Sequence, residues 1–415
     1  MLRREFLYSS LGWTAATLFG PGLKLGQSLA LEASTTLPLV QARMSDALCQ
    51  SYLINTKIFF NKSAYAHTDA VMDLLKRLGV RGVREKMTVG RSVGTQMQKY
   101  AMPLLAEAGI RWHGTVAEVA DWEQATFANK EVMDLLTSYY YPRMGNDLST
   151  LMHSFGGCNE VDNRRNGSEW ATHARVMQQA LWDQAKANPT TRNIPVAGPS
   201  TRTDVTATRA ADLGDLSAMC DMGNGHLYNK GTSPTREIDE HLGVLRPVFP
   251  HVADWIMTET GYNNSPQDNL GKTIPEFASA TYAPRAVCDF FTRNTAYCRF
   301  ELMDDPNAID YTSQTTINNT SVRDAHFGLV AMTKTTVGES TPDTWREKPE
   351  FQTMARFMGL LADRGSVFTP DGLNVQVSGG GSDLQQLLLQ KRDGRHYLIL
   401  WRDVAVATFY PDAKP

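Results

Sequence analysis

The 415-residue sequence is short of several features that mark common classes of protein. It contains no Gly-x-Gly-x-x-Gly and no Gly-x₄-Gly-Lys-Ser/Thr motif, so a phosphate-cradling nucleotide loop has no support. It has no run of charge and a formal net charge of −3, so we expect no nucleic-acid partner. Its five cysteines lack a Cys-x-x-Cys spacing and a histidine at metal-ligand distance. We therefore expect no disulfide framework, no metal site and no cofactor.

The N-terminus resembles a twin-arginine export signal. Arg3-Arg4 precedes a weakly apolar stretch from Leu11 to Leu31 that Gly and Pro interrupt. The stretch is too broken and too short for a membrane span of ~20 residues, so we expect no stable span in the mature chain. We predict that residues 1–33 address the chain to the twin-arginine export machinery and that the protein works in the periplasm or outside the cell. The alternative is an N-terminal helix with two unrelated arginines.

From residue 52 onward, short apolar runs alternate with helical patterns, which is typical of βα units and a parallel sheet. In residues 67–78, for example, apolar side chains recur at helical spacing and Gly79 follows. A doubly wound open sheet shows the same alternation, but it would be favoured by a nucleotide loop after the first strand. We therefore predict an α/β fold with a (β/α)₈ TIM barrel over residues 50–345. The expected strands are residues 51–60, 80–83, 110–116, 151–156, 194–197, 219–227, 255–259 and 296–303.

Beyond the barrel the pattern changes. A helix is expected within a connecting segment at residues 346–365, followed by a small C-terminal antiparallel β-domain at 366–415. The strand-like runs there are residues 375–377, 384–390 and 397–401, and Asp393-Gly394 is a hairpin signal. Because only about four strands are recognisable, either this domain borrows a strand from residues 37–50 or the chain is a truncated form.

Two glutamates follow the expected strands at the ends where barrel active sites lie. Glu160 ends the fourth strand region, in Gly-Gly-Cys-Asn-Glu, and Glu259 ends the seventh. Arg84 follows the second strand, and the sixth ends in Asn-Gly-His-Leu-Tyr, which contains His226 and Tyr228. The competing interpretation is that both glutamates are solvated loop residues or partners of arginines. Two carboxyl groups can divide the work of glycoside cleavage, in which one protonates the departing oxygen and the other meets the anomeric carbon.

This arrangement resembles clan A of the glycoside hydrolases, whose motif is Asn-Glu at the end of strand four and a second Glu at the end of strand seven. The resemblance covers roughly residues 50–345 and extends to the phrase His-Phe-Gly-Leu at 326–329. The layout is most similar to clan members close to family 39, which join a barrel to a β-rich C-terminal domain. It implies a retaining glycosidase acting on an oligosaccharide, polysaccharide or glycoside, with Glu160 as general acid/base and Glu259 as nucleophile.

The neighbours of the glutamates suggest supporting roles. We expect the Glu259 carboxylate to raise the pKa of Glu160, so that Glu160 is the protonated partner. Arg84 and Tyr228 are candidates to hold Glu259 anionic and oriented. Asn159 is expected to bond the sugar hydroxyl next to the anomeric carbon, although asparagine at this place could also cap a turn.

Three further side chains are candidates for substrate binding. His226 is expected to contact substrate or Glu160, with a structural role as the alternative. The eighth strand lacks the aromatic floor that clan A relatives often carry there as tryptophan, and Phe300 is the candidate replacement, with Glu301 able to reach hydroxyls. Lys57, Glu85 and Asp162 carry less weight. The competing function is an exported carbohydrate-binding protein on a barrel scaffold that has lost its chemistry.

Overall fold

The computed structural model describes residues 37–116, 119–163, 166–265, 273–304, 326–332 and 341–407. Residues 1–33 lie outside them, so the export signal stays a prediction. The centre of the molecule is a seven-stranded parallel sheet in the order β6-β5-β4-β3-β9-β8-β7. Its strands are β3 (Tyr52–Asn55), β4 (Gly82–Lys86), β5 (Arg111–Thr115), β6 (Met152–Gly156), β7 (Met222–Leu227), β8 (Asp254–Thr260) and β9 (Thr295–Arg299).

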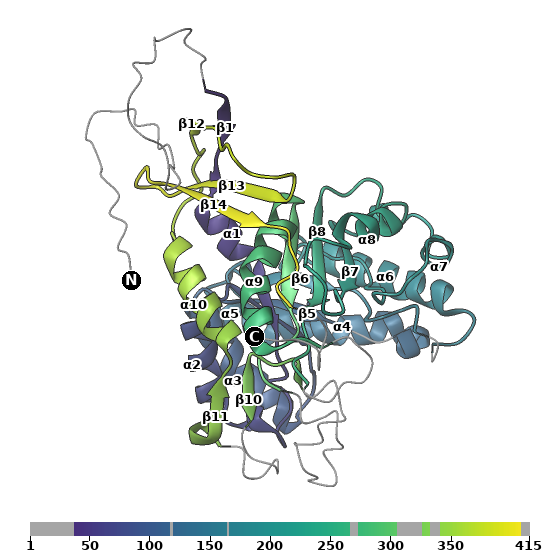
Figure 1. Ribbon diagram of the computed structural model, residues 1–415. Helices are drawn as coiled ribbons and strands as arrows, with labels where there is room; N and C mark the ends of the chain where they lie inside the picture. Colours follow the sequence, from purple (N-terminus) through teal and green to yellow (C-terminus); the bar gives the residue numbers. More distant parts are fainter. Residues whose placement is uncertain are drawn as a thin grey trace, which may run out of the picture.

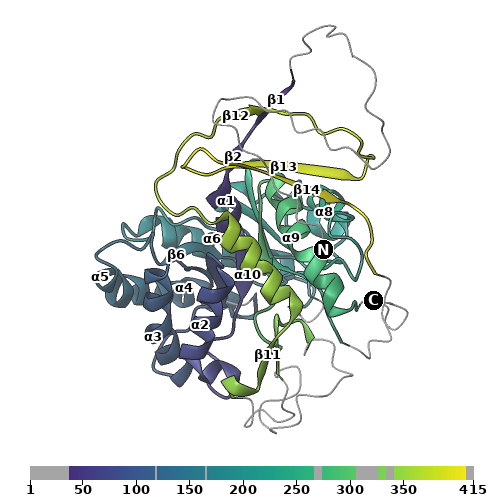
Figure 2. The same cartoon turned by 60° about the vertical axis from the view of Figure 1, so that its left-hand side comes forward.

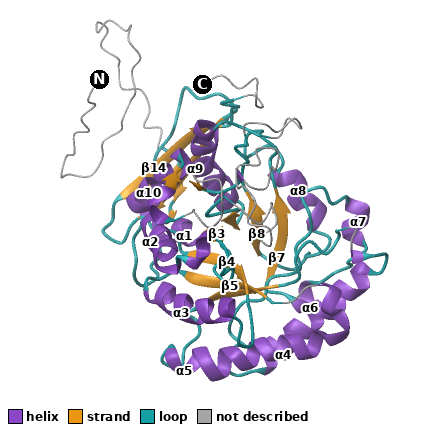
Figure 3. Cartoon of the chain, turned by 90° about the horizontal axis from the view of Figure 1, so that it is seen from below, coloured by secondary structure: helices purple, strands orange, loops and turns teal. Residues whose placement is uncertain are grey.

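The sheet curls into a barrel-like form with helices around it (Figure 3). The expected fifth strand, residues 194–197, is reduced to two isolated bridges, from Val196 to Phe155 of β6 and from Ala197 to Met222 of β7. These bridges connect the two edge strands of the sheet. The prediction of a full strand was wrong because Pro195 lacks the N–H that a continuous ladder requires. The first and eighth expected strands are also shorter than predicted, since β3 ends at Asn55 and β9 at Arg299.

The helices form where apolar residues recur with a period near 3.6. In α2, Val71, Leu75 and Leu78 are buried, and Gly79 ends the helix in the left-handed conformation that glycine adopts without strain (φ 74°). The helices are α1 (Ser45–Gln50), α2 (Thr68–Leu78), α3 (Val93–Glu107), α4 (Ala125–Leu135), α5 (Tyr141–Arg143), α6 (Trp170–Ala187), α7 (Ala207–Ala211), α8 (Ile238–Leu245), α9 (Glu276–Thr292) and α10 (Pro349–Leu361). Among the described residues, no helix is both long and apolar enough to cross a bilayer.

A small β-structure lies beside α1 and joins segments from the two ends of the described chain (Figures 1 and 2). Strands β13 (Leu384–Gln390) and β14 (His396–Arg402) form an antiparallel hairpin, and β2 (Arg43–Met44) pairs parallel with β13. A second antiparallel pair joins β1 (Leu39–Gln41) to β12 (Gly372–Asn374). The strand expected at 375–377 was therefore wrong by three residues, because the register with β1 places 372–374 in the ladder. Two separate small sheets thus take strands from residues 39–44, and the three-stranded one, which contains β2, is mixed and not purely antiparallel.

Helix α10 packs against α9 and is tied to the central sheet by a buried ion pair. Arg299, the last residue of β9, donates from Nε to Glu350 Oε1 (2.6 Å) and from Nη2 to Oε2 (2.9 Å). A two-strand ladder of β10 (Val330–Met332) and β11 (Trp345–Glu347) leads into this helix. All five cysteines are buried and free. The carboxyl ends of the parallel strands thus lie at one end of the molecule and the small β-structure near the other (Figure 1).

Candidate active site

Glu160 lies four residues beyond β6, on a segment whose backbone is tightly constrained. Gly157 has no room for a side chain, since a Cβ there would lie 2.5 Å from Gln178 Oε1 and 2.7 Å from Pro199 N. Glu160 itself has a φ of 42°, a left-handed conformation that is uncommon for residues other than glycine. Its backbone is held on both sides, because Glu160 N donates to Ser200 Oγ (3.1 Å) and Asn166 Nδ2 donates to Glu160 O (3.2 Å). Strain of this kind collects at functional sites.

Glu259, on β8, receives a donor on each carboxylate oxygen. Arg84 of β4 donates from Nη1 to Oε1 (2.7 Å), and the Tyr228 hydroxyl, just after β7, donates to Oε2 (2.9 Å). Arg84 also donates from Nη2 to Asn159 Oδ1 (2.5 Å). The structure therefore brings Arg84, Tyr228 and Asn159 together around Glu259. The side chain of Glu259 is 13% exposed and that of Glu160 25%.

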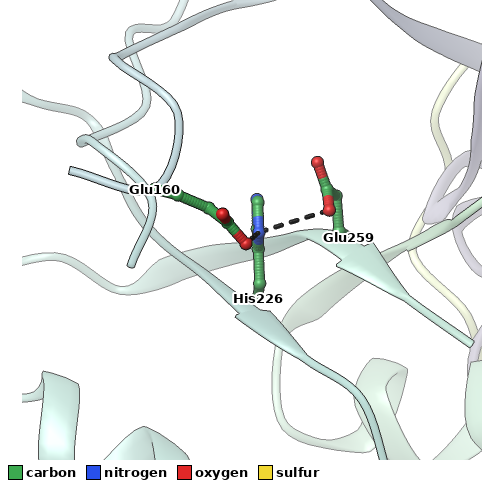
Figure 4. A group of neighbouring side chains, drawn as sticks. All are labelled: Glu160, His226 and Glu259. Carbon is green, nitrogen blue, oxygen red and sulfur yellow. Dashed lines mark hydrogen bonds and ion pairs between the residues drawn. The ribbon is translucent and has the colours of Figure 1, made fainter. Parts of the chain in front are cut away.

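His226, on β7, lies between the two glutamates (Figure 4). Its Nδ1 is 3.4 Å from Glu160 Oε1 and 3.4 Å from Glu259 Oε2. The ring is fully buried, whereas both carboxylates reach solvent. One oxygen of each glutamate and one nitrogen of His226 all lie within 4.8 Å of one another. The two carboxylates are thus close enough to interact electrostatically.

The electrostatics of Glu160 differ from the sequence-based prediction. Burial raises the pKa of the Glu160 carboxyl, but the hydrogen bond and charge of His226, with help from Arg202 and Asn163, outweigh burial and lower it below its usual range. The prediction of a raised pKa was therefore wrong for the ligand-free protein, because it counted Glu259 as the decisive neighbour and omitted the closer donor. The pKa of Glu259 is also lowered, since His226 and Arg84 outweigh both burial and the repulsion of Glu160.

The remaining predicted residues lie just beyond β9. Phe300 packs edge-on against Tyr228, with ring centroids 6.2 Å apart, and the Lys57 ammonium lies 5.3 Å from its centroid. Glu301 is fully buried, and its carboxylate pairs with Lys57 Nζ at 3.1 Å. Lys57 thus contacts both Phe300, the predicted sugar platform, and Glu301, the carboxylate predicted to reach sugar hydroxyls.

Two residues near the site were not assigned a role from the sequence. Asn55, at the end of β3, accepts from Arg84 Nη1 at 2.7 Å and donates to Thr258 O at 2.9 Å, so it fixes the guanidinium against β8. In the sequence, the feature that could have pointed to Asn55 is its place as a polar residue directly after a buried apolar run. Phe327 lies 5.3 Å from Tyr228 and 5.6 Å from Phe300, measured between ring centroids. Its contacts join segments far apart in the chain, so no local pattern reveals them.

The other two candidates of less weight, Glu85 and Asp162, make structural contacts. The carboxylate of Glu85 accepts from Thr56, Gln98 and the backbone of Phe59. That of Asp162 accepts from the backbone N–H of Arg202 at 2.9 Å. Both carboxylates therefore stabilise the loops that follow the strands through hydrogen bonds.

Glu160, His226 and Glu259 also satisfy the spacing of a three-ligand metal cluster. Each oxygen of Glu259 already accepts a hydrogen bond, however, and the Arg84 cation sits against one of them. A second cation would have to displace these donors and would be repelled by the guanidinium. The donor set fits an acid/base pair better than a metal centre.

Comparison with known proteins bears on the fold. No protein-family model matches the chain, and a search of curated proteins gives no match. Among solved structures, the GH1 β-glucosidase of Exiguobacterium antarcticum B7 is similar, with a TM-score of 0.51 at 12% identity over 75% of this chain and 98% of that one. A glucosidase of Croceicoccus marinus has a TM-score of 0.51 at 11% identity, over 78% of this chain and 69% of that one. These likenesses show a shared TIM-barrel-like fold.

Proposed function

We propose that the protein is a retaining glycoside hydrolase that acts on a glycan or glycoside outside the cytoplasm. The observation that carries the proposal is the pair of strand-end glutamates, with carboxylate oxygens within 4.8 Å of each other. Retaining glycosidases place their carboxyl groups ~5–5.5 Å apart, whereas inverting ones need ~6.5–9.5 Å to admit water. The clan A resemblance and the glycosidase fold agree with this assignment. A relationship to members close to family 39, and export by the twin-arginine route, stay predictions.

Glu259 is the nucleophile in this proposal because Arg84 and Tyr228 keep its carboxylate ionised and aimed. One of its oxygens attacks the anomeric carbon, the bond to the departing oxygen breaks, and the Glu160 carboxylic acid gives its proton to that oxygen. Asn159 Oδ1 is already occupied by Arg84, so its amide group is the part that donates to a sugar hydroxyl. The product of this step is an ester of Glu259.

In the second step Glu160 takes a proton from water, the water oxygen attacks the anomeric carbon, and the ester bond breaks to restore the Glu259 carboxylate. The low pKa of Glu160 suits its role as base. For the first step, a bound sugar must shield Glu160 from solvent, since burial raises the pKa of this carboxyl. We therefore expect an acidic pH optimum, with activity falling as pH rises past the pKa of Glu160.

The test is a panel of chromogenic aryl glycosides assayed under mildly acidic conditions. A hydrolysed sugar is then resynthesised as its 2-deoxy-2-fluoro glycoside, which should inactivate the protein and attach to the peptide that contains Glu259. Proton NMR of the first-formed product should show the configuration of the substrate. Labelling of another residue, or an inverted product, would refute the retaining mechanism.

The alternative, an exported carbohydrate-binding protein without chemistry, draws support from the lowered pKa of Glu160, which disfavours the acid form. Glycan-array binding without release of reducing sugar would favour it. Reducing sugar released in proportion to protein would exclude it, provided that Glu240→Gln, a change at an exposed glutamate of α8, leaves the release unchanged.

A further inference from the structure

A cavity of about 380 Å³ opens at the end of the sheet opposite the glutamates, where the parallel strands begin. Its wall includes Arg111, the first residue of β5, and Arg43 of β2 in the small β-structure. Trp255 and Phe291 add apolar surface. The cavity is therefore built where the strand β2 approaches the barrel-like sheet, far from the proposed catalytic pair.

The two arginines of this cavity are half-buried and lack the carboxylate partner that the buried arginines have. Arg81 pairs with Asp46 at 2.6 Å, and Arg84 and Arg299 pair with glutamates. Within the described part of the chain, neither Arg43 nor Arg111 has a carboxylate at ion-pair distance. Burial lowers the pKa of both guanidinium groups, with no opposing carboxylate contribution.

The contacts of the two arginines with their surroundings include no ion pair among the described residues, although Arg43 contacts a ring and a backbone carbonyl. The Arg43 guanidinium lies 3.5 Å from the centroid of the Phe291 ring, and its Nη1 donates to Phe291 O at 2.6 Å. Burial, and then the charge of Arg111, lowers the pKa of His153 to about 3, so this neighbouring imidazole is neutral and adds no negative charge. Two carboxylates also belong to the cavity wall, those of Asp221 and Asp254. The Asp221 carboxylate accepts from Lys186 Nζ and from Val196 N, each at 2.8 Å, and Asp254 is exposed to solvent, so neither serves as the partner of an arginine.

We propose that this cavity binds a small oxyanion, a carboxylate or phosphate group, through the guanidinium groups of Arg111 and Arg43. A partly buried cation without a counter-charge is costly, and a planar guanidinium fork matches an oxyanion with two parallel hydrogen bonds. The volume falls in the range of small-molecule pockets, and the aromatic side chains can cover the uncharged part of an organic anion. The site is independent of the glycosidase proposal, because no residue of the catalytic pair contributes to it.

The test is isothermal titration of the full chain with inorganic phosphate and, separately, with succinate, at an ionic strength held constant with sodium chloride. We expect saturable binding of at least one of the two, and the one that binds identifies the chemistry of the anion. Arg111→Gln should weaken the binding ~10-fold or more, as expected for loss of a charge-assisted hydrogen bond. Arg175→Gln removes one positive charge from α6, away from the cavity, and should leave the affinity unchanged.

A second measurement tests the unmet charge directly. In low-salt buffer without oxyanions, Arg111→Gln should melt at the same temperature as the parent protein or higher, because it removes an unpartnered cation. Three results would overturn the proposal: no saturable binding of either anion, equal affinity in Arg111→Gln, or a lower melting temperature of this variant in anion-free buffer.

Discussion

The two ends of the parallel sheet differ in whether their arginines are paired with carboxylates. At the carboxyl end, Arg84 and Arg299 are each paired with a glutamate, and both carboxylate oxygens of Glu259 accept a hydrogen bond. At the amino end, Arg43 and Arg111 line a cavity without a carboxylate partner among the described residues. Paired charges fix the geometry of a site before a ligand binds, whereas unpaired charges can gain favourable free energy by pairing with a bound ligand. The first end is organised for chemistry and the second for capture of an anion.

The largest effect is expected at the carboxyl end. Glu259→Gln removes the attacking oxygen anion but keeps a side chain of the same shape beside Arg84, so turnover of a confirmed aryl glycoside should fall at least ~10³-fold. Initial rates measure the loss, and circular dichroism checks folding. Turnover within a few-fold of the parent protein would remove the catalytic assignment of this end.

A stability measurement sharpens the contrast between paired and unpaired arginines. Arg299→Met leaves Glu350 buried without a partner and should cost about 3–5 kcal/mol of the free energy of unfolding, measured by urea denaturation. The double variant Arg299→Met/Glu350→Leu should recover much of this loss, because it removes both charges. A cost no greater than that of Arg111→Gln would contradict the difference between the two ends.

The residues at the carboxyl end of the sheet were largely predictable from the sequence, because parallel strands bring their carboxyl ends together. Glu160, His226 and Glu259 could be placed from strand-end position alone, and the structure brings them together. The direction of the pKa shift at Glu160 could not be predicted from the sequence, because it depends on a 3.4 Å contact with His226, a residue of another strand. The cavity at the amino end of the sheet has no sequence motif, because an arginine at the start of a strand has the same local pattern whether or not a carboxylate faces it.

The fold shows a similar division. Apolar periodicity predicted the seven strands of the central sheet and the helix α2, because these depend on local pattern. The sequence of residues 194–197 predicts a strand, although in the structure Pro195 limits this segment to isolated bridges. The strand β12 was displaced because its register is set by β1, more than three hundred residues earlier, and pairing at that distance has no local signature.

A change at Arg84 tests whether its pairing sets the ionisation of Glu259. Arg84→Met removes the hydrogen bonds to Glu259 and Asn159 and should lower kcat/KM by ~10²-fold, the size expected for lost bonds to a charged group. The positive charge of Arg84 lowers the pKa of Glu259, so its loss should move the acidic limb of the pH profile to higher pH. An unshifted limb would mean that Arg84 acts on structure alone.

Asp289 offers a buried negative charge near the small β-structure, where Trp401 Nε1 donates to it at 3.1 Å. Burial raises its pKa from 3.8 to about 6, so the folded protein binds more protons than the unfolded chain between these values. Stability should therefore fall as pH rises through this window. Asp289→Asn should flatten the dependence, by at most about 3 kcal/mol between about pH 4 and about pH 7, as followed by urea denaturation. Asp183→Asn, at an exposed position on α6, should keep the parent slope.

The smallest expected change is at His226, which alone among the described residues lies within ion-pair distance of both glutamates. His226→Gln removes the group that lowers the pKa of Glu160 and of Glu259, so both limbs of the kcat/KM profile should move to higher pH while the maximum changes by less than ~10-fold. Arg84→Met should move only the limb of Glu259, because Arg84 is not among the groups that set the pKa of Glu160. If His226→Gln shifted one limb only, the histidine would serve a single glutamate, and the carboxyl end would lack the shared donor that couples its two charges.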